Sequence, residues 1–202
     1  QGIRFRVSID EIIRFYKSAI EKGSVKAMFN YGRMLYFGDG IPRDEQEGIK
    51  LWKMAVDNGN TYAMNNLAFL LYTGENIPED KEKALIYYNM AALKGNFSAI
   101  HNLACIYRNG FKTQKDLKKA VDILNMGIEL KDPESMCKCA DIYRYGGVGL
   151  NADKKKAMEL YQMAINEGNT DAMPSYADML RDNEGGVCDK QKALDLYKRA
   201  MN

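Results

Sequence analysis

Few side chains in this sequence are suited to acid, base or nucleophilic chemistry. The only histidine is His101, which could exchange a proton near neutral pH. No motif fixes a nucleophile or a carboxylate beside it, so a solvated or packing histidine is the simpler interpretation. The sequence also lacks a glycine-rich phosphate loop and a nucleophile motif. We therefore expect no catalytic residue, and a protein that is not an enzyme.

The four cysteines, Cys105, Cys137, Cys139 and Cys188, do not have the spacing of a metal site. Cys137 and Cys139 are two residues apart, so they point to different sides of a helix. We interpret all four as reduced thiols that pack or lie at the surface. The sequence predicts neither a bound metal nor another cofactor.

Charge and hydropathy limit the kinds of partner. Lys and Arg number 29 against 27 Asp and Glu, a net charge of +2, which lacks the basic excess typical of nucleic-acid binding. No apolar run approaches the roughly 18 residues of a membrane span, and the first residues lack the apolar core of a signal peptide. We expect a cytoplasmic protein. The glycosylation pattern Asn96-Phe97-Ser98 keeps the lumen of the endoplasmic reticulum as an alternative.

An internal repeat supplies the elements that must position any site. The stretch that begins at Ala27 aligns without a gap with the stretch 36 residues later, at Ala63. Further copies begin at Ala99, Ser135 and Ala172, with one extra residue before the last. We predict a single domain over 1–202 with a leading helix over 8–24 and repeats over 27–62, 63–98, 99–134, 135–171 and 172–202. Because the chain starts with Gln1 on half a repeat, we expect a fragment of a longer protein.

Each repeat has the pattern of two helices, A and B. Numbered from the first residue of each copy, positions 1, 2, 5, 6, 8 and 9 of helix A are small or apolar, the spacing of a broad buried face. An aspartate recurs where the N-cap of helix B belongs, namely Asp44, Asp80, Asp116, Asp153 and Asp189. Ser8 and Glu11 have the spacing of a capping box for the leading helix. Helix B ends near a glycine, as at Gly23, Gly59, Gly95 and Gly168.

Two positions of helix B recur at the repeat spacing: one carries a small residue and the other usually carries an aromatic residue. A small-residue series allows neighbouring helices to approach closely and comprises Ala19, Ala55, Ala91, Gly127, Ala164 and Ala200. An aromatic series fills the larger gaps around it and comprises Tyr16, Trp52, Tyr88, Tyr161 and Tyr197. Both series predict core packing rather than a cofactor site.

The repeat resembles the Sel1-like repeat (SLR) family, a relative of the tetratricopeptide repeats. The copy over 63–96 carries the resemblance best, with Asn66-Leu67-Ala68, Gly74, Asp80, Lys83-Ala84 and Tyr88. The resemblance implies an all-α fold, a right-handed α/α superhelix (solenoid) of about five two-helix repeats of 36–37 residues plus a leading helix. Two departures are Lys131-Asp132-Pro133, where a glycine is usual, and Pro174 in the last helix A.

Two functions follow from the resemblance and from the missing catalytic motifs. The first is a non-enzymatic scaffold or adaptor, active in signalling, that holds a partner peptide or domain in its concave groove. The second is a regulatory or substrate-recruiting module of a larger enzyme, such as a protein kinase or a ubiquitin ligase complex. In both cases the partners are proteins or peptides. Open solenoid ends also predict self-association.

Positions 3, 4, 7 and 11 of helix A lie off the apolar face, so we expect them to line the groove. The predicted partner-binding residues are Asn30, Arg33, Phe37, Asn66, Phe69, His101, Asn102, Lys138, Asp141 and Tyr145. The amides at position 4 could clamp a peptide backbone, although they could equally bond within or between neighbouring helices. The groove should run from basic, at Arg33, to acidic, at Asp178 and Asp182.

Overall fold

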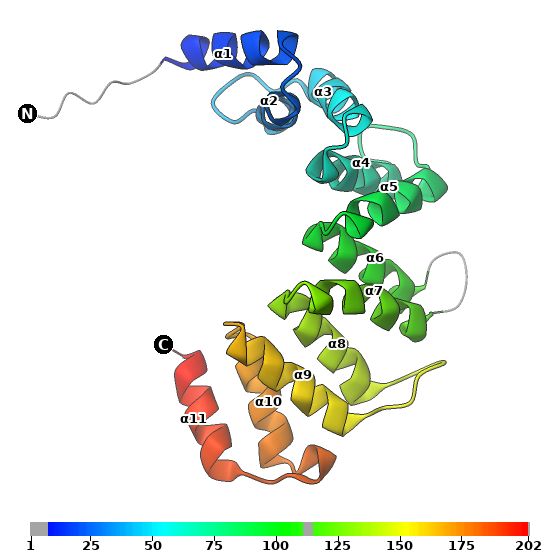
Figure 1. The fold of residues 1–202 in the computed structure, drawn as a ribbon, viewed down its shortest axis with the longest axis vertical. Coiled ribbons are helices and arrows are strands. Elements are labelled where there is room, and N and C mark those ends of the chain that lie inside the picture. Colours follow the sequence, from blue (N-terminus) through cyan, green and yellow to red (C-terminus); the bar gives the residue numbers. More distant parts are fainter. Residues whose placement is uncertain (1–7, 111–114, 202) are drawn as a thin grey trace, which may run out of the picture. The chain divides into compact units, whose positions relative to one another are not determined.

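A computed structural model of the chain describes residues 8–110 and 115–201. Its regular secondary structure there is entirely helical, apart from one isolated bridge between Gly147 and Leu150. The chain forms two compact units, Gln1–Asn96 and Phe97–Asn202. In each unit successive helices pack as antiparallel pairs (Figure 1). The all-helical two-helix repeat is therefore confirmed, while the single domain over 1–202 stays a prediction.

The first unit holds the leading helix and two repeats. Its helices are α1 (Ile9–Glu21), α2 (Val25–Phe37), α3 (Glu45–Asp57), α4 (Thr61–Thr73) and α5 (Lys81–Leu93). Helices α2 and α4 are the A helices of the sequence pattern, and α3 and α5 are the B helices. Helix α1 has the register of a B helix, because it begins 36 residues before α3.

The second unit holds three repeats. Its helices are α6 (Phe97–Asn109), α7 (Leu117–Glu129), α8 (Pro133–Tyr145), α9 (Lys154–Asn166), α10 (Ala172–Arg181) and α11 (Lys190–Ala200), with the 3-10 turn η1 (Glu184–Gly186) before α11. Helices α6, α8 and α10 are A helices, and the others are B helices.

Helix caps set the bounds of the B helices, as the sequence predicts. Each of the five aspartates accepts a hydrogen bond from the backbone N–H three residues later, at 2.8 to 3.0 Å. The capping box of Ser8 and Glu11 is present. Gly95 follows α5 with a left-handed φ of 77°, and Lys131 takes the equivalent place after α7 with φ 60°. A lysine thus adopts a backbone conformation that favours glycine.

The A helices carry N-caps that the sequence analysis did not identify. Ser24 caps α2, Asn60 caps α4 and Asp132 caps α8, each through a side-chain oxygen. Asn169 Oδ1 accepts from the N–H of Ala172 at 2.9 Å. Each of these residues directly follows the left-handed residue that ends helix B, so one dipeptide stops one helix and starts the next.

The predicted small-residue and aromatic series form the core in the middle of each unit but not at the chain ends. Ala55, Ala91 and Ala164 have no exposed surface, and Trp52 is 1% exposed. Its indole N–H donates to the Phe29 carbonyl at 3.2 Å. Tyr16, Ala19 and Tyr197 are only half-buried and Ala200 is exposed, because each outermost helix packs on fewer neighbours.

Helix α1 keeps much of its apolar side open. None of its residues is fully buried, and Phe15 is 72% exposed. Ile12, Phe15 and Tyr16 line a hollow of about 440 Å³ together with Asn30 of α2. The first unit therefore presents an apolar surface at its leading helix.

Helix α5 also differs from the other B helices. Its outer side carries Ile86, Met90 and Leu93, which are 57%, 40% and 77% exposed. The residues equivalent to Ile86 are charged in every other B helix, namely Arg14, Lys50, Asp122, Glu159 and Asp195. An apolar stripe at helical spacing is therefore peculiar to α5.

Candidate functional site

The A helices of each unit lie side by side, which makes their outward side chains one surface. In the first unit the rings of Phe29 and Tyr62 are 5.7 Å apart near the start of α2 and α4. Near the other end, the Tyr36 hydroxyl receives a 3.0 Å hydrogen bond from Asn76 and donates to Glu75 at 3.5 Å. Contacts at both ends hold α2 and α4 in parallel.

The surface of the first unit combines one cation with exposed aromatic rings. Arg33 is exposed and, among the described residues, makes no hydrogen bond or ion pair. Phe37 and Phe69 are 62% and 46% exposed. The two position-4 amides are half-buried: Asn66 accepts from Asn65 at 3.4 Å, and Asn30 lines the hollow beside α1. Arg33 and the two phenylalanines are therefore the accessible members of the predicted set in this unit.

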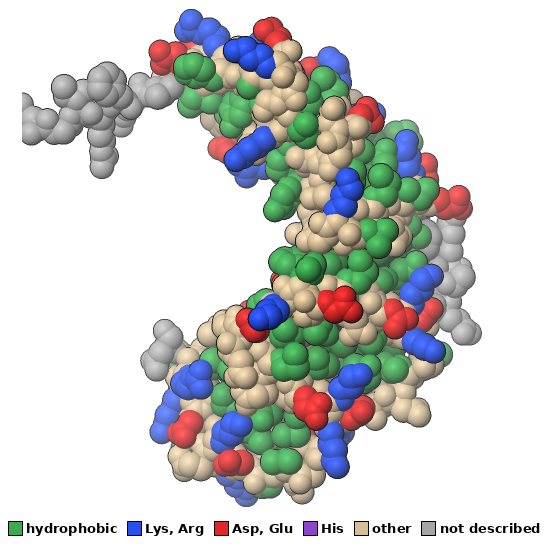
Figure 2. All heavy atoms as spheres, viewed as in Figure 1, with side chains coloured by type: hydrophobic (Ala, Val, Ile, Leu, Met, Phe, Trp, Pro, Cys, Tyr) green, Lys and Arg blue, Asp and Glu red, His purple; other side chains and the backbone are tan. Residues whose placement is uncertain are grey.

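Exposed apolar side chains also appear in space-filling view among scattered charges on the visible face of each unit (Figure 2). This mixture fits a surface that contacts other proteins better than one that binds a polyanion, because the described residues on this face form no broad basic area.

In the second unit His101 joins the start of α6 to the start of α8. Its Nε2 lies 2.7 Å from Asp132 Oδ2 and 3.1 Å from Ser135 Oγ, and its Nδ1 lies 3.4 Å from Glu134 Oε2. The His101 side chain is only 13% exposed. Burial alone would raise the pKa of Asp132, but hydrogen bonds from Ser135 and His101 outweigh it and hold that pKa below its usual value.

The histidine cluster has the composition of a catalytic triad without its arrangement. In a triad the nucleophile bonds to one imidazole nitrogen and the acid bonds to the other. Here Asp132 shares Nε2 with Ser135, and the carboxylate opposite, Glu134, lies 3.4 Å from Nδ1, which is longer than the catalytic hydrogen-bond range of about 2.6 to 3.2 Å. Ser135 has no exposed surface, so a substrate cannot reach its hydroxyl. The packing interpretation of His101 fits this geometry, although the sequence analysis did not anticipate the carboxylates around it.

Gly127 makes room for this cluster. A Cβ at Gly127 would lie 2.1 Å from Ser135 Oγ. Neighbouring repeats pair two alanines at these positions, as with Ala55 and Ala63. The change to glycine on α7 therefore accompanies the change to serine on α8.

The other predicted residues of the second unit divide into exposed and bonded groups. Tyr145 is 72% exposed, with the Arg144 guanidinium 5.4 Å from its ring centre. Lys138 forms an ion pair with Glu134 at 3.0 Å, and Asn102 is half-buried. Asp141 accepts a hydrogen bond from the Tyr161 hydroxyl, so it connects α8 to α9. Burial and this carboxylate raise the pKa of Tyr161.

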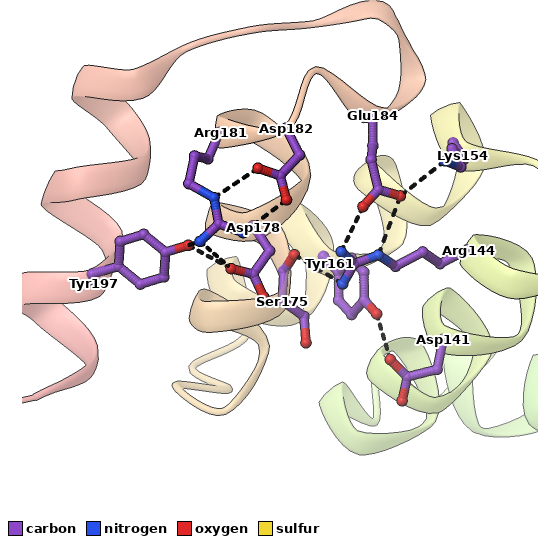
Figure 3. A network of polar contacts seen from close by, with 10 residues as sticks. All are labelled: Asp141, Arg144, Lys154, Tyr161, Ser175, Asp178, Arg181, Asp182, Glu184 and Tyr197. Atoms are coloured by element: carbon purple, nitrogen blue, oxygen red, sulfur yellow. Dashed lines mark hydrogen bonds and ion pairs between the residues drawn. The ribbon is translucent and has the colours of Figure 1, made fainter.

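The acidic residues expected at the end of the groove are paired within the unit (Figure 3). Asp178 accepts from the Tyr197 hydroxyl at 2.5 Å and lies 3.1 Å from Arg181. Asp182 forms an ion pair with the same arginine at 2.7 Å. Arg181 therefore offsets one of their two negative charges, which weakens the expected acidic end.

A second network lies beside them. Arg144 Nη2 donates to Glu184 Oε1 at 2.6 Å, and Lys154 Nζ lies 3.2 Å from Glu184 Oε2 (Figure 3). The hydrogen bond from Arg144 is the main reason that the pKa of Glu184 lies below its ordinary value. A recurring residue in the sequence indicates this network: position 13 of the repeat is a glutamate both at Glu75 and at Glu184.

A larger hollow of about 730 Å³ lies between the last turns of α6 and α8. Its lining includes Arg108, Lys115, Asp141, Tyr145 and Val148. A smaller one of about 40 Å³ lies beside His101 and Lys138.

Two further observations bear on chemistry. All four cysteines are free, and burial is the main cause that raises the pKa of both Cys137 and Cys139 to about 11, which disfavours the reactive thiolate. Residues 8–110 and 115–201 contain no cluster of histidine, cysteine and carboxylate that could hold a metal ion. Over those same ranges no helix is long and apolar enough to cross a membrane.

A family model for the Sel1 repeat matches most of the chain, at residues 25–60, 61–96, 97–132, 133–169 and 186–201. The chain belongs to the Sel1 repeat family. The family model begins each of its first four Sel1 repeats two residues before the boundary predicted from the sequence. Those earlier boundaries coincide with the first residues of α2, α4, α6 and α8.

Solved structures with the same fold include other Sel1 repeat proteins. A Sel1 repeat protein from Oxalobacter formigenes is 28% identical with a TM-score of 0.81, over 93% of this chain and 77% of that one. The protective antigen c5321 of uropathogenic Escherichia coli, described as having an SLR fold, is 23% identical with a TM-score of 0.82, over 95% of this chain and 41% of that one. The immunity protein Pa5087 of Pseudomonas aeruginosa is 17% identical with a TM-score of 0.60, over 94% and 72%. A search of curated proteins gives no match.

Sel1 repeat proteins are generally protein-interaction modules and are not typically enzymes. Membership of the family therefore indicates a protein-interaction module. The accessible side chains of the A helices are the candidates for its contact surface.

Proposed function

We propose that this Sel1 repeat chain is a non-enzymatic scaffold that holds a peptide or domain of a partner protein against its A helices. The observation that carries the proposal is the surface of α2 and α4, where Arg33, Phe37 and Phe69 are exposed together. Aromatic and arginine side chains are over-represented among the residues that dominate binding energy. Arg33 forms no ion pair with any residue that the structure describes, so its donors are available for a ligand.

The proposal assigns different roles to the predicted residues. Arg33, Phe37, Phe69 and Tyr145 are the contact residues, because their side chains are accessible. Asn66 and Asn102 border them. Asp141 and His101 hold neighbouring helices in place, and Lys138 is half-buried and forms an ion pair with Glu134.

Crosslinking from defined positions tests this function. A photoreactive phenylalanine analogue replaces Phe69 in one protein and Lys53, on the exposed side of α3, in a control. After illumination in native lysate, we expect one or a few proteins to be linked from position 69 and not from position 53. A variant with Arg33→Ala and Phe37→Ala should lose those links. Equal linking from both positions, or links that survive the double substitution, would contradict the proposed surface.

A further inference from the structure

Position 10 of helix A makes a recurring contact with the loop after the next helix A. In the first unit Tyr36 occupies position 10 of its repeat and contacts Glu75 and Asn76, which are positions 13 and 14 of the following repeat. In the second unit Arg144 occupies position 10 and binds Glu184, position 13 of the next repeat, at 2.6 Å (Figure 3). The side chain at position 10 thus meets a carboxylate in both units.

Arg108 occupies the same position 10 but contacts no carboxylate among the residues that the structure describes. Positions 13 and 14 of the following repeat are Gly147 and Val148, which have no polar side chain. Among the described residues the only polar side-chain contact of the Arg108 guanidinium is with Cys105 Sγ, at 3.9 Å. The third arginine at this position, Arg181, pairs with Asp178 and Asp182. Arg108 is therefore the arginine of this series that lacks a carboxylate.

The space left by the missing carboxylate is the hollow of about 730 Å³, which both Arg108 and Gly147 line. A second cation, Lys115, lies at its edge and forms no ion pair with any residue that the structure describes. On the apolar side Tyr145 and Val148 are 72% and 66% exposed. The hollow thus places two cations beside two exposed apolar side chains, and its volume falls in the range of ligand pockets.

One carboxylate opposes the two cations. Asp141 also lines the hollow, but it already accepts the hydrogen bond of the Tyr161 hydroxyl. Arg144 does not line the hollow and is paired with Glu184. The charge presented to a ligand therefore remains positive.

We infer that this hollow binds an acidic segment of a partner protein, with a glutamate or aspartate side chain on Arg108 and an adjacent apolar side chain against Tyr145 and Val148. The inference rests on the proposed scaffold function and adds the chemistry of the ligand. The carboxylate takes the place that Glu184 takes on Arg144 in the next repeat. Arginine binds carboxylates through paired N–H groups, so the segment should be recognised by charge and by shape.

Peptide binding to the full chain tests the inference. The probe is an acetylated and amidated hexapeptide of alternating glutamate and leucine, and its matched control has glutamine for glutamate. A third peptide, of glutamine and leucine with a free C-terminus, tests the terminal carboxylate as the alternative source of charge. Affinity is measured by fluorescence anisotropy, and the binding site by chemical-shift changes at the amides of Tyr145 and Val148.

We expect the glutamate peptide to bind at least ~10-fold more tightly than the glutamine peptide. Arg108→Gln should abolish this preference. Val148→Glu should abolish it as well, because it adds a carboxylate at the position equivalent to Asn76. Lys118→Gln removes one charge from an exposed residue of α7 that does not line the hollow, so the preference should remain. Circular dichroism of each variant checks that the helices are retained.

Three results would overturn the inference: equal affinity for the glutamate and glutamine peptides, an undiminished preference in Arg108→Gln, or binding of the free-terminus peptide alone. Binding of the partner that is crosslinked from position 69 shows whether only the ligand assignment fails or the scaffold function fails as well. If that partner still binds while the glutamate peptide does not, the scaffold function stands and the assigned ligand is wrong.

Discussion

Gly127 and Ser135 occupy positions at which the neighbouring repeats carry a pair of alanines. Ser135 is fully buried and hydrogen-bonded to His101, and Gly127 removes the methyl group that its hydroxyl would otherwise meet. The effects of these two residues on the free energy of unfolding are therefore coupled, because the missing methyl group at Gly127 leaves room for the hydroxyl group of Ser135.

We predict that Gly127→Ala destabilises the protein by about 1 to 3 kcal/mol, the usual effect of overpacking a close contact. Adding Ser135→Ala restores the alanine pair of the other repeats and should recover part of the loss. Urea denaturation of both single variants and the double variant gives the coupling energy. Additive effects would show that Gly127 does not accommodate the serine hydroxyl.

The carboxylate of Asp132 gives a prediction for the pH dependence of stability. Its pKa is lower in the folded protein than the ordinary value of about 3.9. The stabilisation is therefore fully present above the unfolded pKa and is lost as the pH falls through the folded pKa. Asp132→Ala should lower the free energy of unfolding by about 1 to 2 kcal/mol at pH 7, and the deficit should shrink on acidification below pH 4.

Urea denaturation between pH 2.5 and 7 measures this dependence. Asp116→Ala is the matched control, because Asp116 also caps a helix but is exposed and has no histidine beside it. A deficit in Asp132→Ala that stays constant down to the lowest pH would contradict the role assigned to the ionised carboxylate.

At the scale of the helices, one dipeptide ends a helix B and begins the next helix A at the starts of α2, α4, α8 and α10. The first residue has a left-handed backbone conformation, and the second caps the following helix. Glycine fills the first position except at Lys131, where φ is 60°. The cost of a side chain in this conformation is about 1 kcal/mol.

We predict that Lys131→Gly stabilises the protein by up to about 1 kcal/mol, since it removes this strain at some cost in chain entropy. The reciprocal change, Gly95→Lys, should destabilise it by a similar amount. Thermal unfolding of the two variants checks the opposite signs. Loss of stability in both would mean that the Lys131 side chain makes a contact worth more than the strain.

The sequence was sufficient to predict the helices, because their caps and apolar positions recur at one spacing. Asp44 and its four equivalents determine the start of each helix B without tertiary information. The site was harder to predict, because the position of a residue in the repeat does not show which hydrogen bonds or ion pairs its side chain forms. Asp141 and Lys138 share a helix surface with Tyr145, yet both are engaged by residues on the same or a neighbouring helix. The position of His101 in the repeat predicts an outward side chain, whereas its carboxylate neighbours come from the start of the next helix A.

On the scale of the whole molecule, apolar surface at α1 is the feature that bears on assembly. Phe15 is 72% exposed beside the hollow at Ile12 and Tyr16. We predict that the chain self-associates as its concentration rises and that Phe15→Lys weakens this association by removing apolar contact area. Sedimentation velocity over a range of concentrations measures the effect.

Leu93→Lys serves as the control, because Leu93 is equally exposed but belongs to the α5 stripe. Self-association that responds to Leu93→Lys and not to Phe15→Lys would place the contact on α5 instead. A protein that stays monomeric at all concentrations would contradict both.

The linked set of Gly127, Asp132, Ser135 and His101 also bears on how such an array can evolve. Repeat arrays change by gaining, losing and exchanging repeats, which is tolerated when each repeat fits any neighbour. Here the serine lies on one repeat, while the histidine and the glycine lie on the repeat before it. Moving either repeat alone would place a buried hydroxyl against an alanine methyl or leave it without the imidazole. We therefore expect the order of these two repeats to be fixed, and recombination within the array to be tolerated where alanine meets alanine.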